Sequence, residues 1–308
     1  MMMRHIGLAL LVFAGLSACG EYSGAGVPNR NALTLPNHPN SVVAQKVADT
    51  PVSYPYTFVL MADPHGAPGE PVFTALLDQI LALTPTPVFV AVIGDFTETG
   101  TVPEILAYLD IVDTYPIPLF SIIGNHEEWA PVEQSRANYA AYFGAEDFSF
   151  DFAKARFVAL NDIVIGADGL TNSQMQWMNK RLNHRPHPDR YILMHQPPPI
   201  IPPPWGPPPF QNEQNFYNSV AVYNVRLVAS GHIHEFRHLQ SGNAHYLVTG
   251  GSGGYQGEVL DNPPNQGIFK HFLLVTVQAD GNSRVEVYKL GESAPDPAYT
   301  VQFQTTVQ

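Results

Sequence analysis

The stretch ASGHIHEF, residues 229–236, places two histidines, His232 and His234, directly after the apolar run 225–228. In an extended chain alternate side chains point to the same side, so the two imidazoles converge if the strand conformation continues. Neutral imidazole nitrogens are common metal ligands. A pair of exposed or hydrogen-bonded loop histidines explains the same residues, so the rest of the chain must decide between these interpretations.

Four other places share this arrangement, in which an apolar run ends and polar residues of metal-binding type follow at once. These residues are Asp63 and His65 after 59–62, Asp95 after 89–93, Asn125, His126 and Glu127 after 120–123, and His195 after 191–194. Ligands of open α/β sheets bind at the carboxyl ends of the strands, so the five places are expected to meet at one edge. Taken singly, each is also explained as a helix cap, a turn residue or a loop histidine. Their succession favours a metal site.

Short β-branched runs alternate with helical patterns beyond residue 54, which predicts a sheet with parallel character and helices on its faces. The expected strands are 56–61, 88–93, 118–123, 156–160, 191–194 and 226–229. The expected helices are 72–83, 103–114, 132–143, 172–182 and 213–222. The later runs 246–249, 271–277 and 284–290 follow one another with turns between, which predicts antiparallel pairing.

The ordered series D-x-H, G-D, G-N-H-E, H and G-H-x-H resembles the calcineurin-like metallophosphoesterase superfamily over about residues 58–234. The resemblance implies an α/β fold, a four-layer α/β/β/α sandwich with two mixed sheets and a dinuclear metal site at the C-terminal edge of the strands. It implies that one metal ion is held by Asp63, His65, Asp95 and His234. It implies that the second is held by Asp95, Asn125, His195 and His232, with Asp95 bridging the two ions.

Oxygen and imidazole ligands without thiolates suit ions such as Mn, Fe or Zn, so two divalent or mixed-valence ions are the expected cofactors. A water held between two such ions is acidified and attacks phosphorus as a hydroxide. The resemblance thus implies hydrolysis of phosphate mono- or diesters, with His126 as the proton donor to the leaving oxygen and Glu98 orienting His126. The alternative is a non-catalytic surface lipoprotein that uses the same fold for binding.

The sequence departs from the patterns of two subfamilies, which narrows the choice of subfamily. In the segment 94–100, GDFTETG, Glu98 and Thr99 stand where phosphoprotein phosphatases carry an aspartate and an arginine, so a bidentate phosphate clamp is missing there. Purple acid phosphatases carry a tyrosine at the position of Glu98, which disfavours that subgroup as well. The glycine-rich segment 249–257 lacks the Gly-Lys-Ser/Thr of a nucleotide loop. It is either a turn between strands or a wall of the pocket with Tyr255.

Residues 1–18 have the features of an export signal. Arg4 precedes the apolar run Ile6–Leu16, which at 11 residues is shorter than the about 20 that a membrane-spanning helix needs. The sequence LSAC at 16–19 resembles a bacterial lipobox, which predicts lipidation of Cys19, the only cysteine of the chain. The protein is then expected to be anchored to the bacterial membrane and to face the periplasm or the cell exterior. An ordinary signal peptide is the alternative. Residues 19–53 are interpreted as a tether, with a short helix possible at 42–47, and residues 54–308 as the metallophosphoesterase domain.

The formal net charge of −12 argues against a basic face that tracks a nucleic acid. Nucleic acid is therefore not an expected partner. The expected partners are a small phosphate ester as the substrate and, through lipidated Cys19, the membrane. One further segment, 195–210, contains nine prolines. It is interpreted as a rigid rim or lid over the pocket, or as a binding motif for proline-recognition modules.

Overall fold

The computed structural model describes residues 39–304 except 130, 164–168, 185–186, 202–208, 257–259 and 263–265. The expected export signal, Cys19 and residues 202–208 of the proline-rich segment lie outside the described residues. Within the described part of the chain, no helix has both the length and the apolar character needed to cross a membrane.

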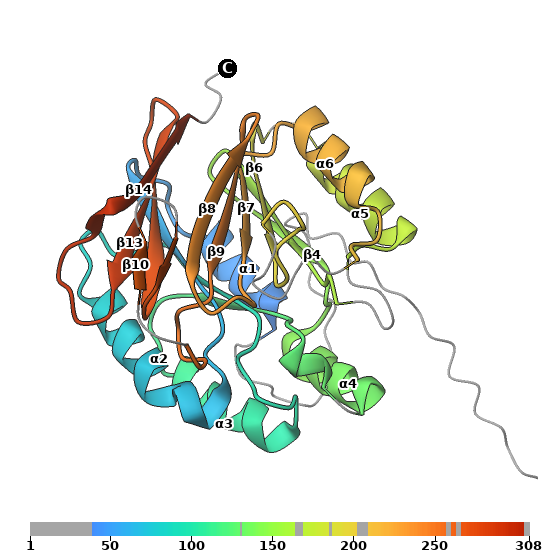
Figure 1. The fold of residues 1–308 in the computed structure, drawn as a ribbon, viewed down its shortest axis with the longest axis vertical. Coiled ribbons are helices and arrows are strands. Elements are labelled where there is room, and N and C mark those ends of the chain that lie inside the picture. The colour runs from blue at the N-terminus through green and yellow to red at the C-terminus, as the bar shows by residue number, and fades with distance from the viewer. Residues whose placement is uncertain are drawn as a thin grey trace, which may run out of the picture.

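Two mixed β-sheets form the centre of the molecule (Figure 1). The strands of the first are β1 Tyr56–Met61, β2 Val90–Ile93, β3 Leu119–Ile122, β12 His271–Val277, β13 Asn282–Lys289 and β14 Asp296–Gln304. The strands of the second are β4 Phe148–Phe152, β5 Ala155–Leu160, β6 Asp189–Met194, β7 Leu227–Ser230, β8 Phe236–Ser241, β9 Ala244–Thr249, β10 Leu260–Asn262 and β11 Gln266–Ile268. Their orders are β14-β13-β12-β1-β2-β3 and β10-β11-β8-β9-β7-β6-β5-β4.

Each sheet contains a set of parallel strands beside antiparallel ones. Strands β1, β2 and β3 run parallel, and so do β5, β6 and β7. The expected antiparallel pairing holds for β12 with β13, whereas β9 pairs parallel with β7 and antiparallel with β8. The carboxyl ends of two parallel sets are therefore available for one site.

Helices cover the outer faces of both sheets, which confirms the four-layer sandwich (Figure 1). The helices over the first sheet are α2 Gly66–Leu81, α3 Val102–Val112 and α4 Val132–Phe143, and those over the second are α5 Asn172–Leu182 and α6 Glu213–Val222. Leu76 and Ile105 pack on the first sheet and Met178 and Phe216 on the second, all of them fully buried. A single-turn 3-10 helix, η1 His126–Glu128, follows β3.

Aromatic side chains fill the space between the two sheets. The rings of Phe58 and Phe89 stack with their centroids 5.0 Å apart, and those of Phe150 and Phe157 stack at 4.7 Å. Such pairs contribute about 0.5–1.5 kcal/mol beyond the burial of their apolar area. Between the sheets, the ring of Phe157 meets that of Phe58 edge-on with centroids 5.2 Å apart, and the ring of Phe150 stacks on that of Phe120 at 4.0 Å. These contacts fix the position of one sheet on the other.

A helix precedes β1 and belongs to the folded body. It is α1 Asn40–Ala48, in which Val43 and Val47 are buried in the core between the sheets. The side chain of Asn40 also holds Ser121 of β3, donating to its carbonyl at 2.8 Å and accepting from its N–H at 3.0 Å. The expectation of a tether to residue 53 is therefore wrong for residues 40–48, because this segment buries apolar surface and pairs with a strand.

Candidate metal centre

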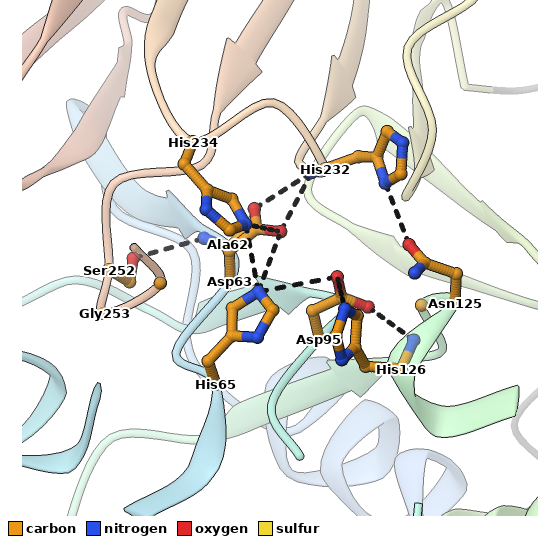
Figure 2. A network of polar contacts seen from close by, with 12 residues as sticks. Ala62, Asp63, His65, Asp95, Asn125, His126, His232, His234, Ser252 and Gly253 are labelled. Carbon is orange, nitrogen blue, oxygen red and sulfur yellow. Dashed lines mark hydrogen bonds and ion pairs between the residues drawn. The ribbon is translucent and has the colours of Figure 1, made fainter. Parts of the chain in front are cut away.

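The side chains that follow the parallel strands come together in space. They come from the ends of β1, β2, β3, β6 and β7. Among the described residues they form three groups of closely spaced potential ligands, of which one, His65, Glu98 and His126, shares His65 with the first of the two groups considered next. The first group is Asp63, His65 and His234, and the second is Asp95, His195 and His232. Figure 2 shows Asp63, His65, Asp95 and His234 turned toward one another, with His126 beside Asp95.

In the first group two imidazoles face each other. The Nε2 atoms of His65 and His234 lie 3.0 Å apart, and they lie 3.9 Å and 3.5 Å from Oδ1 of Asp63. Nδ1 of His65 donates to the Glu98 carboxylate at 3.0 Å, and Nδ1 of His234 donates to the carbonyl of Tyr255 at 2.5 Å. Because both outer partners are acceptors, the rings carry their protons on Nδ1, and both Nε2 lone pairs point to the same place.

The second group is built around two oxygen atoms. Nε2 of His195 lies 3.0 Å from Oδ2 of Asp95 and 3.0 Å from Oδ1 of Asn125, while Nδ1 of His232 lies 2.8 Å from the same Asn125 oxygen. Nδ1 of His195 donates to the carbonyl of Ile93 at 2.8 Å, which leaves Nε2 unprotonated in the neutral ring. A second convergence of lone pairs results.

This donor set fits two metal ions. Two nitrogen ligands at about 2.1 Å from one ion lie roughly 3 to 3.5 Å apart, which is the spacing of the His65 and His234 Nε2 atoms. Asp63 and Asp95 are 0 % and 1 % exposed, and buried carboxylates are costly without a compensating cation. Oδ2 of Asp95, 3.0 Å from His195 and 3.7 Å from His65, lies between the two groups.

The charges around the site shift the pKa values of its imidazoles. Burial by itself lowers the pKa of His195. The neighbouring carboxylates, above all Asp95, raise it by a larger amount, so that the pKa is about 10. Such a site attracts a cation, and a metal ion competes with the proton for the same nitrogen. Burial and the charge of His195 lower the pKa of His232 to about 4, which keeps that ring in the neutral, metal-binding form. Burial raises the pKa of Asp95, yet His195 outweighs this effect and holds it well below its usual range.

Four of these residues adopt left-handed backbone conformations, which residues other than glycine rarely do. Their φ angles are 61° for Asp63, 56° for His65, 54° for Asp95 and 67° for His232. Each such residue costs on the order of 1–3 kcal/mol, and strain of this kind concentrates at functional sites. The strand-end turns are thus held in conformations that turn the ligand side chains inward.

Glu127 holds the turns after β2 and β3 together, a role that the sequence analysis did not assign. Its buried carboxylate accepts the N–H groups of Asp95 and Gly124 at 2.8 Å on one oxygen. The other oxygen accepts the N–H and the hydroxyl of Thr97, both at 2.8 Å. Burial, together with the charge of Asp95, raises the pKa of Glu127, while the hydrogen bonds from Thr97 lower it. The conformation of the Asp95 turn therefore depends on this carboxylate.

Asp162 has a similar role for His195 and was also missed. Its buried carboxylate accepts the N–H of His195 at 3.1 Å and that of Gln196 at 2.9 Å. Burial raises the pKa of Asp162 to about 8. The signal was present in the sequence, because Asn161 and Asp162 follow the end of β5 as the metal ligands follow the other parallel strands.

The structure revises the expected role of Glu98. Its carboxylate bonds to Nδ1 of His65 at 3.0 Å rather than to His126. Nδ1 of His126 instead donates to the backbone carbonyl of Glu98 at 2.7 Å, which leaves Nε2 on the side of Asp95, 4.0 Å from Oδ2. The side chain of Glu98 therefore fixes the tautomer of a ligand histidine, and its main chain orients His126.

The glycine-rich segment lines the metal centre, the second of its two interpretations. A Cβ atom on Gly254 would lie 2.6 Å from Cδ2 of His65 and 2.7 Å from Cε1 of His234, so a side chain there would displace both rings. The amine of Lys270 donates to the carbonyls of Gly253, at 3.0 Å, and Gly254. The segment is thus fixed against the first group of ligands.

The fold and the paired ligand groups define a metallohydrolase of the dinuclear class. A family model described as calcineurin-like phosphoesterase matches residues 56–236, more than half of the chain. The chain belongs to the calcineurin-like phosphoesterase family, which acts on phosphoesters with a dinuclear metal site. It is accordingly an enzyme of phosphoester hydrolysis.

The chain is similar to known phosphodiesterases and to solved metallophosphatase structures. A 3',5'-cyclic-nucleotide phosphodiesterase of Nostoc sp. (strain PCC 7120) is 25% identical over 240 residues, which cover 75% of this chain and 88% of the relative. A probable glycerophosphodiester phosphodiesterase of Arcobacter nitrofigilis is 27% identical over 121 residues, 38% of this chain and 44% of the relative.

The solved structure is a purple acid phosphatase from yellow lupin, Lupinus luteus, with a TM-score of 0.67 and 16% identity. The match covers 82% of this chain and 55% of the lupin chain. At that identity it shows the shared fold.

Proposed function

We propose that this protein hydrolyses small phosphodiesters with the help of two metal ions. We also propose that it is exported and anchored to the membrane by a lipid. The observation that supports the reaction is the convergence of imidazole and carboxylate groups around two points that share Asp95. Two ions held by these groups would acidify a water, so that it can act as the nucleophile, and would stabilise charge on the phosphoryl oxygens. Every ligand position expected from the family pattern carries a residue that can bind a metal ion, which favours catalysis over a purely binding role.

The residues of the chain position and protonate the substrate. Nε2 of His126 is 4.0 Å from Oδ2 of Asp95, so the ring borders the ligand groups while its side chain stays 17% exposed. Since its Nδ1 proton is used by the Glu98 carbonyl, Nε2 is the atom that would hold the proton for the leaving oxygen. His126 is therefore proposed as the general acid.

Two observations favour diesters over monoesters. The hydroxyl of Thr99, which stands where related phosphatases carry an arginine, donates to Glu104 at 2.8 Å and serves the start of α3. A monoester dianion lacks a clamp at that position, and a diester carries one negative charge fewer. Both curated relatives reported above are also named as phosphodiesterases.

Protein loaded with Mn should hydrolyse bis(p-nitrophenyl) phosphate with a kcat/KM about tenfold or more above that for p-nitrophenyl phosphate, because the clamp for a second charge is missing. The rates are followed by p-nitrophenolate release, and metal content by elemental analysis. For a diester with an alkoxide leaving group, such as glycerophosphoglycerol, His126→Ala should lower kcat by about 100-fold or more with metal content unchanged, and the loss should be smaller on the p-nitrophenyl esters, whose leaving group departs as an anion. No hydrolysis of either ester after metal loading contradicts the proposed reaction and leaves the binding alternative.

The proposed location rests on the N-terminal sequence. Arg4, the apolar run Ile6–Leu16 and the LSAC sequence support export followed by lipidation of Cys19. The full chain, expressed in a bacterium, should fractionate with the membrane and release only with detergent, whereas Cys19→Ala should appear in the soluble exported fraction. Equal membrane association of both proteins would reject the lipid anchor.

A further inference from the structure

Two residues that contact histidines of the metal centre have aromatic side chains exposed to solvent. Trp129 is 51% exposed and Tyr255 is 87% exposed, and among the described residues they are the two aromatic members of the exposed large hydrophobic set. Exposing an aromatic side chain forgoes the burial free energy that it would gain in a core. Neither side chain is therefore explained by packing of the fold.

Trp129 lies directly beside the proposed general acid. Its ring centroid is 4.8 Å from that of His126, with an angle of 31° between the planes, and His126 is itself 4.5 Å from His65. The hydroxyl of Ser135 donates to the carbonyl of Trp129 at 3.2 Å and fixes its main chain. The indole thus lies against His126, the residue proposed to protonate the leaving oxygen.

Tyr255 lies at the other end of the same row of rings. The ring centroids of His65 and His234 are 4.7 Å apart, and the carbonyl of Tyr255 accepts the Nδ1 proton of His234. The two exposed aromatic residues come from segments that are far apart in the sequence, yet each contacts a histidine of one site. Trp129 therefore contacts the site through its ring, and Tyr255 through its carbonyl group.

We propose that Trp129 is a specificity residue that stacks on a nucleobase, so that the preferred substrate of this site is a nucleoside phosphodiester. The inference rests on the proposed phosphodiesterase function. Indole and base faces attract each other irrespective of base identity, and such stacking is typical of sites that accept nucleotides without a fixed sequence. Because His126 protonates the leaving oxygen, a ring attached through the leaving sugar falls beside Trp129.

The test compares substrates with and without a base. With Mn-loaded protein, Trp129→Ala should raise KM for adenosine 3',5'-cyclic monophosphate by about tenfold and leave the kinetics of glycerophosphoglycerol unchanged. By calorimetry, the same variant should raise Kd for adenosine 5'-monophosphate by about tenfold and leave that for inorganic phosphate unchanged. Trp129→Phe should restore most of the affinity. Val222→Ala, at a residue that is 76% exposed on α6, is the matched surface control.

Each outcome separates the inference from the function on which it rests. An equal fall of kcat on both esters, with nucleotide binding unchanged, would show that Trp129 only holds His126 in place and would overturn the inference. Wild-type binding of the nucleotide no tighter than of phosphate would overturn it as well. If wild-type protein hydrolyses neither ester but Trp129→Ala still weakens nucleotide binding alone, the proposed reaction fails and the base-binding surface stands.

Discussion

Replacing Asp95 by Asn is expected to lower kcat/KM for a phosphodiester by about 1,000-fold, since a metal centre contributes several kcal/mol and each 1.36 kcal/mol is a factor of ten. The carboxylate lies between the ligand groups, with Oδ2 3.0 Å from Nε2 of His195 and 3.7 Å from that of His65. An amide has almost the same shape but no charge, so it removes the compensation for two cations. Metal content should fall together with turnover.

Oδ1 of Asp95 accepts the backbone N–H of His126 at 2.9 Å, so the substitution must be separated from a change in the position of that residue. His126→Ala serves this purpose, because it should lower turnover with full metal content. Asp110→Asn, at an exposed position of α3, controls for the loss of one surface charge. Wild-type metal content together with wild-type kcat/KM in the Asp95→Asn variant would refute the bridging position.

Much of the site could be predicted because its residues follow a simple physical pattern. Asp63, Asp95, Asn125 and His195 each follow a buried strand, and parallel strands bring their carboxyl ends to one edge. The sequence could not show which partner each side chain meets. Glu98 is close to His65 and to His126, and the path of the chain alone decides that its carboxylate reaches His65.

Strand β4 was missed although its sequence FSFDF alternates between aromatic and polar residues, whereas several other missed or misplaced elements lack a strong local signal. Strands β8 and β14 carry many polar residues, and their places depend on distant partners, β9 and β13. Helix α2 begins at Gly66, whereas the sequence predicted a start at residue 72. The prediction was late because Gly66, Gly69 and Pro71 are weak helix formers and give no helical periodicity. That first turn follows His65 directly, so the early start places the helix against the metal centre.

Glu127→Gln is expected to destabilise the metal-free protein by about 3 kcal/mol, because buried donors that lose their acceptor cost about 1–3 kcal/mol each. The wild-type carboxylate accepts four hydrogen bonds, from the N–H groups of Asp95, Gly124 and Thr97 and from the hydroxyl of Thr97. In the amide one oxygen becomes an NH2 group, which points two hydrogens at groups that donate. Urea unfolding in the presence of EDTA measures this effect apart from metal binding.

The same substitution should also weaken metal binding, although Glu127 is not a ligand. The N–H of Asp95 is one of its donors, and Asp95 has a left-handed φ of 54°, so the acceptor holds the ligand turn in a strained conformation. Loss of an outer partner of a metal ligand typically costs about 10–100-fold in affinity. Glu133→Gln, exposed on α4, should change neither quantity. If Glu127→Gln unfolds at the wild-type urea concentration and binds Mn with wild-type affinity, the carboxylate does not organise the site, and the turns after β2 and β3 are held by their own backbone hydrogen bonds.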